Sequence, residues 1–127
     1  MKIGNLEVYG VIYKITNKIN GKVYIGQTIQ SNGFDDRYKY NAVCDIEKVY
    51  RYYQNRKDWS KYWNKHLVYA IEKYGFDAFE VDKVFDVAFS KEELNVKEQS
   101  WILIYDSYNN GYNNDGGGST RRKFKVT

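Results

Sequence analysis

The sequence predicts an α+β fold, and three observations indicate it. Two neighbouring segments are rich in β-branched and aromatic residues, and the residues between them favour a turn. Two later segments repeat apolar residues at helical spacing, and a third strand-like segment lies between them. The chain has 127 residues, 43% of them apolar, which is typical of one folded domain with a single core.

The first predicted element is a β-hairpin. Segments 8–16 and 22–28 are rich in Val, Ile, Tyr and Thr, and an Asn-Gly pair between them supplies turn residues. If the turn has two residues, Tyr13 pairs with Thr28, and Tyr13 and Tyr24 lie on one face of the hairpin. A bulge in either strand would change this pairing.

Two helices are expected in the middle of the chain. A short helical stretch follows Gly33 and carries Arg37. A longer helix begins at Ser60, a residue type that caps helices well, shows apolar residues at helical spacing and ends at Gly75. The basic and aromatic segment before Ser60 is not assigned to an element.

A third strand and a last helix follow. Residues 79–87 alternate, so we expect Phe85 on the same face as Val81 and the acidic side chains on the other face. Residues 90–93 form a capping box, which opens a helix that runs to about residue 105.

One carboxylate in this last helix lies in an unexpected position. Glu98 falls on the same helical stripe as Leu94 and Ile102, so its side chain should face the core. A buried carboxylate costs several kcal/mol unless it is paired or bound to a metal. Its partner is therefore a divalent cation or an Arg, and an ion pair with Arg37 at the edge of the core is the structural alternative.

Composition excludes several classes of protein. With one Cys and one His, the chain can form neither an internal disulfide nor a zinc site of four Cys and His ligands, so any metal must be bound mainly by oxygen. It has no apolar run long enough to span a membrane and no apolar core of a secretory signal at its N-terminus. We therefore expect a cytoplasmic protein without a membrane partner.

Positive charge is concentrated in two places. The net charge is +4, and the last seven residues carry four of the 20 Lys and Arg side chains and no acidic one. Residues 48–66 interleave positive and aromatic side chains, which favours nucleic-acid phosphates and bases, although an ordinary solvated face explains the pattern equally well. The predicted DNA-binding residues are Lys48, Arg51, Arg56, Lys57, Lys61 and Lys65.

The hairpin resembles the signature of the GIY-YIG nucleases. Val-Ile-Tyr at 11–13 and Tyr-Ile-Gly at 24–26 are separated by ten residues, and their surroundings are similar to phage and intron-associated members. An Arg, a Glu within a helix and Gly-Tyr-Asn at 111–113 follow in the family order. Val11 stands where the family has its leading Gly.

The resemblance implies a small three-stranded antiparallel β-sheet flanked by helices, and metal-dependent hydrolysis of DNA phosphodiesters. It implies that Tyr13 or Tyr24 positions or deprotonates the attacking water, and that Arg37 stabilises charge on the phosphate. Glu98 would then be the ligand of Mg²⁺ or Mn²⁺, and Asn113 would support the site by hydrogen bonding.

Three more residues are candidates near this site. Lys22, two residues from Tyr24, could lower the pKa of a tyrosine base, and Gly26 could let backbone approach the substrate. His66 could be a general base, a phosphate contact or a tyrosine partner, or it could pack in its helix. Many members carry a His four residues after the Arg, where this chain has Asn41, and this departure weakens a mechanism with a His base.

The expected domain comprises residues 1–115, followed by a flexible Gly-rich linker and basic tail at 116–127. Within the domain, residues 41–63 are expected to be an insertion that contacts DNA, because this stretch is longer than a minimal member of the family needs. Two alternatives follow from these boundaries. The chain either acts alone or is the catalytic fragment of a longer endonuclease.

Three functions remain open at this stage. The first is a metal-dependent endonuclease of phage or homing type, acting on double-stranded DNA as a monomer or transient dimer. The second is a non-catalytic DNA-binding module on the same scaffold, and the third is a structural or protein-binding domain.

Overall fold

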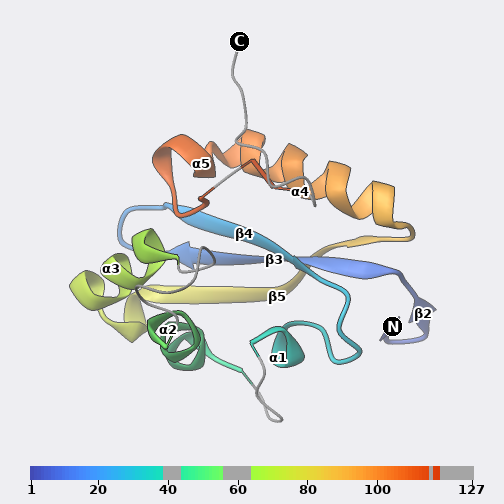
Figure 1. Ribbon diagram of the computed structural model, residues 1–127, viewed down its shortest axis with the longest axis horizontal. Coiled ribbons are helices and arrows are strands. Elements are labelled where there is room, and N and C mark those ends of the chain that lie inside the picture. The colour runs from blue at the N-terminus through green and yellow to red at the C-terminus, as the bar shows by residue number, and fades with distance from the viewer. Residues whose placement is uncertain (39–43, 56–63, 115, 118–127) are drawn as a thin grey trace.

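The computed structural model describes residues 1–38, 44–55, 64–114 and 116–117, and it shows three layers (Figure 1). An antiparallel β-sheet of three strands forms the middle layer. Helices α4 (Lys91–Tyr105) and α5 (Ser107–Asn110) lie on one side of it, and α1 (Phe34–Arg37), α2 (Ile46–Gln54) and α3 (Lys65–Tyr74) lie on the other. The predicted α+β fold is confirmed.

The strands of this sheet are β3 (Gly10–Asn17), β4 (Val23–Thr28) and β5 (Phe79–Ala88), in the order β4-β3-β5. β3 is therefore central, and β4 lies at an edge. A separate hairpin of β1 (Lys2–Ile3) and β2 (Leu6–Glu7) lies at the far end of the sheet from α3 (Figure 1). A single 3₁₀ turn, η1 (Phe76–Ala78), connects α3 to β5.

The hairpin of β3 and β4 is present, but its register differs from the predicted one. Tyr13 pairs with Gly26 rather than with Thr28. The reason is a longer turn, because the last ladder bond runs from the amide of Asn17 to the carbonyl of Lys22 at 2.9 Å and leaves residues 18–21 in the turn. Since the shift is by two residues, Tyr13 and Tyr24 keep a common face.

The third strand is confirmed, but the expected alternation of its side chains is wrong at Phe85. Lys14 pairs with Asp82 and Ile12 with Asp86, so three residues of β5 lie opposite one residue of β3. This irregularity turns Phe85 to the other face of the sheet, where its ring lies 4.8 Å from the ring of Trp101.

Helix α4 matches its predicted bounds, and α3 ends at the predicted Gly75. The Ser90 hydroxyl accepts from the amide of Glu93 at the start of α4, as expected for a capping box. Helix α3 begins later than predicted, because the Asn64 side chain caps it by accepting from the amide of Leu67 at 3.1 Å. Ser60, the predicted cap, lies outside the described residues.

The core has a part on each face of the sheet. Tyr13 and Ile15 of β3 pack against α2 and α3, whereas Ile12 and Ile25 pack against α4. In the described part of the expected DNA-contacting insertion 41–63, α2 contributes the buried Val49 and Tyr53 to this core. This helix is thus part of the folded domain itself.

The first residues of the predicted Gly-rich linker are buried in the structure, whereas a flexible linker was expected. Gly116 and Gly117 are buried, and Gly117 lies against α4, so neither is part of a flexible connector. The basic tail lies outside the described residues. Among the helices that the structure describes, none is long and apolar enough to cross a membrane.

Candidate active site

Four tyrosine hydroxyls form a chain between the central strand and α2. Tyr13, on β3, is completely buried, and its hydroxyl lies 2.8 Å from that of Tyr38. The Tyr38 hydroxyl lies 3.1 Å from that of Tyr53, which donates in turn to the Tyr24 hydroxyl at 3.5 Å. The two signature tyrosines, Tyr13 and Tyr24, are thus joined through residues that the sequence analysis did not single out.

Arg37 lies against this cluster. Its guanidinium carbon is 4.8 Å from the centre of the Tyr38 ring and 5.7 Å from that of Tyr52, and Nη1 contacts the Tyr52 hydroxyl at 3.5 Å. Within the described part of the chain Arg37 forms no ion pair, so the alternative of an Arg37–Glu98 pair is not seen there. Aromatic rings therefore hold the guanidinium in place and leave its charge available for an anion.

The ionisation behaviour of these groups follows from burial. Loss of hydration raises the pKa of Tyr13, Tyr24 and Tyr38 above the ordinary value of 10.0, although the charge of Arg37 acts in the opposite direction on all three. The Tyr13 hydroxyl has the largest effect on Arg37 and raises its pKa, and the hydroxyls of Tyr38, Tyr53 and Tyr24 raise it further. At neutral pH the tyrosines are neutral hydrogen-bonding groups and Arg37 is a fixed cation.

These raised pKa values predict a loss of stability in alkali. Above about pH 10 the unfolded chain releases phenolic protons that Tyr13, Tyr24 and Tyr38 retain in the folded state. The free energy of unfolding should keep its full value below pH 10. Above that pH it should fall by up to about 1.4 kcal/mol per pH unit for each of these tyrosines. Urea unfolding at pH 8, 10 and 11 measures the fall, and a free energy of unfolding that stays constant to pH 11 would contradict the prediction.

Gly26 gives Tyr13 the space that it occupies. A Cβ atom at position 26 would overlap the Tyr13 ring and its hydroxyl, because the two residues are paired across β3 and β4. The absence of a side chain at Gly26 thus serves the packing of Tyr13, which differs from the expected close approach to a substrate.

Replacing Gly26 by Ala should force the Tyr13 ring out of place and destabilise the protein by about 1–3 kcal/mol, the usual cost of overpacking. Urea unfolding measures this loss. Gly21→Ala is the control for substitution of a hairpin glycine, because an added Cβ at Gly21 meets nothing within 4 Å, although its φ of 76° carries a separate strain. A smaller loss for Gly26→Ala than for Gly21→Ala would refute the packing argument.

The predicted inward position of Glu98 is confirmed, since only 7% of its surface is exposed. The side-chain amide nitrogen Nε2 of Gln27, on β4, donates to Oε1 of Glu98 at 2.8 Å and to Oδ1 of Asn95 at 3.0 Å. Both amide hydrogens of Gln27 are used, so this side chain fixes the carboxylate and the preceding turn of α4 together. The charge of Glu98 also acts on Tyr13 across the sheet.

Gly117 packs closely against the same carboxylate. A Cβ atom there would lie 3.1 Å from Oε1 of Glu98 and 2.6 Å from Cδ1 of Ile102, and its φ of 84° favours glycine. The backbone at 117 therefore helps to bury Glu98.

Asn113 holds the edge strand. Its side-chain oxygen accepts from the amide of Ile25 at 2.9 Å, and its side-chain nitrogen donates to the carbonyl of Ile25 at 2.8 Å. The side chain thus acts like a neighbouring strand beside β4 at the residue between Tyr24 and Gly26. Its hydrogen bonding is directed at this backbone, which fixes the strand that carries the candidate site.

The other candidates lie away from this centre. Lys22 is exposed directly before the first residue of β4, and Arg37, rather than Lys22, is the cation whose charge acts on Tyr24. His66 is exposed in the first turn of α3, outside the buried face of that helix.

The predicted DNA-binding residues are divided between two helices. Lys48 and Arg51 lie on α2, where Arg51 pairs with Glu47 at 2.8 Å, and Lys65 is the first residue of α3. Arg56, Lys57 and Lys61 lie outside the described residues.

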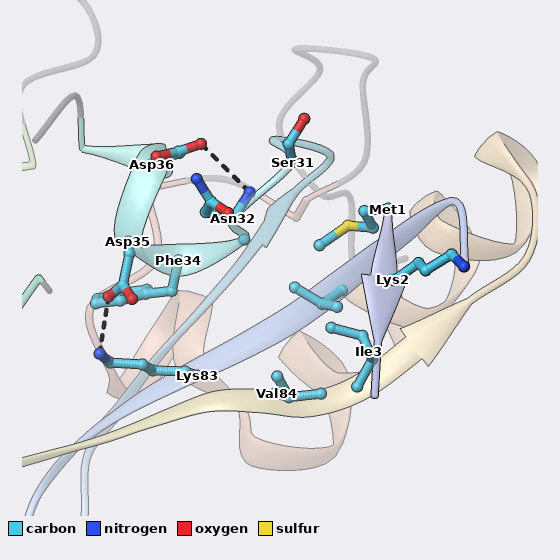
Figure 2. Close-up of a pocket in the computed structure, with 12 residues that line it drawn as sticks. Met1, Lys2, Ile3, Ser31, Asn32, Phe34, Asp35, Asp36, Lys83 and Val84 are labelled. Atoms are coloured by element: carbon cyan, nitrogen blue, oxygen red, sulfur yellow. Dashed lines mark hydrogen bonds and ion pairs between the residues drawn. The ribbon is translucent and has the colours of Figure 1, made fainter. Parts of the chain in front are cut away.

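A hollow of about 510 Å³ lies between α1, β5 and the N-terminal hairpin (Figure 2). Its wall carries an ion pair between Asp35 and Lys83 at 2.8 Å, and its lining includes the apolar side chains of Ile3 and Val84. None of the predicted site residues lines it. It is therefore separate from the candidate active site.

The fold of this chain is similar to that of solved nuclease catalytic domains. Two solved structures of the catalytic domain of the intron and homing endonuclease I-TevI have this fold. A mutant of that domain matches with a TM-score of 0.60 and 23% identity, over 85% of this chain and 95% of that one. The second structure matches with a TM-score of 0.53 and 25% identity, over 82% and 96%.

I-TevI is a GIY-YIG homing endonuclease, so the predicted resemblance is confirmed by the structural comparison. In sequence, neither a protein-family model nor a curated protein matches this chain.

The partners that hold the candidate residues were not predicted from the sequence. Gln27 could have been found, because strand alternation places it on the same face as Ile25, toward the helix that carries Glu98. Tyr38 and Tyr53 gave no such signal, since each is one of 14 tyrosines and only the packing of α1 and α2 brings them to Tyr13.

Proposed function

We propose that the protein is an endonuclease that hydrolyses DNA phosphodiesters with the help of a divalent metal ion. The observation that carries the proposal is that Arg37, which is held by aromatic rings and forms no ion pair among the described residues, lines the same hollow as Gln27, the residue that binds the buried carboxylate of Glu98. A cation for the phosphate and a carboxylate for a metal are the two charges that such a reaction needs.

In the proposed reaction a water oxygen bonds to phosphorus, one P–O ester bond breaks, and the departing oxygen takes up a proton. Arg37 stabilises the negative charge that develops on the phosphate oxygens. Tyr24 is only partly buried and accepts from Tyr53, so its own O–H can be directed at water or phosphate. Because burial raises the tyrosine pKa values, positioning of the water is favoured over its deprotonation by a free phenolate.

Glu98 fits a hard cation such as Mg²⁺ or Mn²⁺. It is a buried oxygen donor whose Oε1 is oriented by a neutral amide, and the described residues contain no cluster of three or more His, Cys, Asp or Glu. Mg²⁺ commonly binds one or two carboxylates and completes its shell with water and substrate phosphate. When bound, such an ion would supply Lewis-acid stabilisation of charge on the phosphate.

The remaining residues take supporting roles in this proposal. Asn113 keeps β4 in place through its two hydrogen bonds to Ile25. Lys48, Arg51 and Lys65 are proposed contacts for the phosphates of the DNA backbone. The proposed roles of Lys22 and His66 in catalysis have less support, because both side chains are exposed and Arg37 already supplies the cation beside Tyr24.

Cleavage of supercoiled plasmid tests the proposal. We expect the purified protein to relax and then linearise the plasmid with Mg²⁺ or Mn²⁺ and to leave it intact with a chelator. A protein that retards DNA in a gel with or without metal, yet never cuts it, would instead be a binding module or a catalytic fragment that lacks its targeting part. A protein that neither cuts nor binds DNA at low salt would have another function.

A further inference from the structure

A second hollow, of about 270 Å³, lies between the end of β4 and the first turns of α4. Arg37 and Lys91 both line it, and the amide side chains of Gln27, Gln30 and Asn95 complete its polar wall. It therefore brings together a predicted site residue and a cation that the sequence analysis did not single out.

Among the described residues, all the charged side chains that line this hollow are positive. Two cations line it and no carboxylate does. In the described part of the chain neither Lys91 nor Arg37 forms an ion pair, whereas Lys97 on the same helix is paired with Asp86 at 3.4 Å. Two cations without an ion pair in one concave surface attract an anion, and the side-chain amide of Gln30 can add a hydrogen bond to its oxygens.

The hollow adjoins the proposed active site. Gln27 and Asn95 belong to its wall, and Gln27 is the residue that binds Oε1 of Glu98 at 2.8 Å. The hollow therefore extends from Arg37 to Lys91 beside the residue that binds the proposed metal ligand. The lining also includes Tyr9, a partly exposed aromatic side chain that a sugar or base could contact.

We propose that this hollow binds a backbone phosphate next to the scissile one, with Lys91 as its principal cation. The inference rests on the proposed function, because it takes Arg37 to face the scissile phosphate. Lys91 is exposed and lies in the first turn of α4, four residues from Asn95 and seven from Glu98 along the same helix, so it can reach a neighbouring nucleotide rather than the reacting phosphorus.

The test replaces Lys91 by Gln, which removes the charge and keeps most of the side chain. The control is Lys73→Gln on α3, an exposed Lys on the opposite side of the sheet (Figure 1). Binding of each protein to a mixed-sequence duplex of about 30 base pairs is measured in chelator over a series of salt concentrations, and the single-turnover rate of plasmid nicking is measured with Mg²⁺ at saturating protein.

For Lys91→Gln we expect the slope of log affinity against log salt to fall by about 0.9, which corresponds to the loss of one phosphate contact. Affinity should fall several-fold, and the saturated nicking rate should change less than about twofold because the reacting phosphate keeps Arg37. Lys91→Arg should restore the wild-type slope. The control should change neither the slope nor the rate.

Two results would overturn the inference. One is an unchanged slope and affinity for Lys91→Gln, or a change no larger than that of the control. The other is a large loss of nicking rate with unchanged affinity, which would place Lys91 at the reacting phosphate. Failure of the proposed function is recognised separately, because it appears in the wild-type protein as absence of cutting, and absence of any binding would remove both proposals.

Discussion

Replacement of Glu98 by Gln is expected to reduce the rate of DNA cleavage at least about 1,000-fold. The substitution keeps the shape of the side chain, and its amide oxygen can still accept from Gln27, but it removes the charge that a divalent metal needs. Loss of the metal from the site would cost several kcal/mol of stabilisation of charge on the phosphate.

The matched control is Glu92→Gln, which makes the same change at an exposed position of the same helix. Single-turnover nicking rates over a range of Mg²⁺ concentrations measure the effect, and duplex binding in chelator should be nearly unchanged for both variants. If Glu98→Gln cuts DNA as fast as Glu92→Gln, the carboxylate has no part in catalysis. Its burial would then be a matter of packing alone.

Replacement of Arg37 by Ala is expected to lower the cleavage rate by about 100-fold to 1,000-fold, because a fixed donor to the phosphate is removed. Arg37→Lys should recover only part of this loss. A lysine keeps the charge, but it has no planar group that could lie on the rings of Tyr38 and Tyr52 while it faces the phosphate.

Lys73→Ala on α3 is the control for removal of a positive side chain, because Lys73 is exposed and belongs neither to the candidate site nor to the proposed DNA contacts. Saturated single-turnover rates separate an effect on the reaction from an effect on binding. The role assigned to Arg37 would be wrong if Arg37→Ala altered only the affinity for DNA and left the saturated rate unchanged.

The order of the three sheet strands and of the helices α1, α3 and α4 could be predicted from the sequence, whereas α2 and the β1–β2 hairpin were not. The two strands of the hairpin, the capping box at 90–93 and the strand at 79–87 each carry a local signal that agrees with the structure. The errors are also local in origin. The hairpin turn is longer than the Asn-Gly pair suggests, and an irregularity in β5 turns Phe85 to α4.

The candidate site could be predicted only in part. Helical periodicity alone placed Glu98 in the core, since the position of a residue around a helix follows from its spacing. The partners of Glu98 and Arg37 could not be predicted in this way. Gln27 lies 71 residues from Glu98, and the rings on Arg37 depend on how α1 and α2 pack.

The sequence by itself thus determined the fold class, the inward face of the last helix and the resemblance that the structural comparison confirms. Each of these depends on side chains close together along the chain, where period and turn chemistry act. The tertiary structure decided the hydroxyl chain from Tyr13 to Tyr24, the absence of an ion pair for Arg37 among the described residues, and the hollow shared with Lys91. These depend on distances between segments far apart in sequence, and only the packing of the layers fixes such distances.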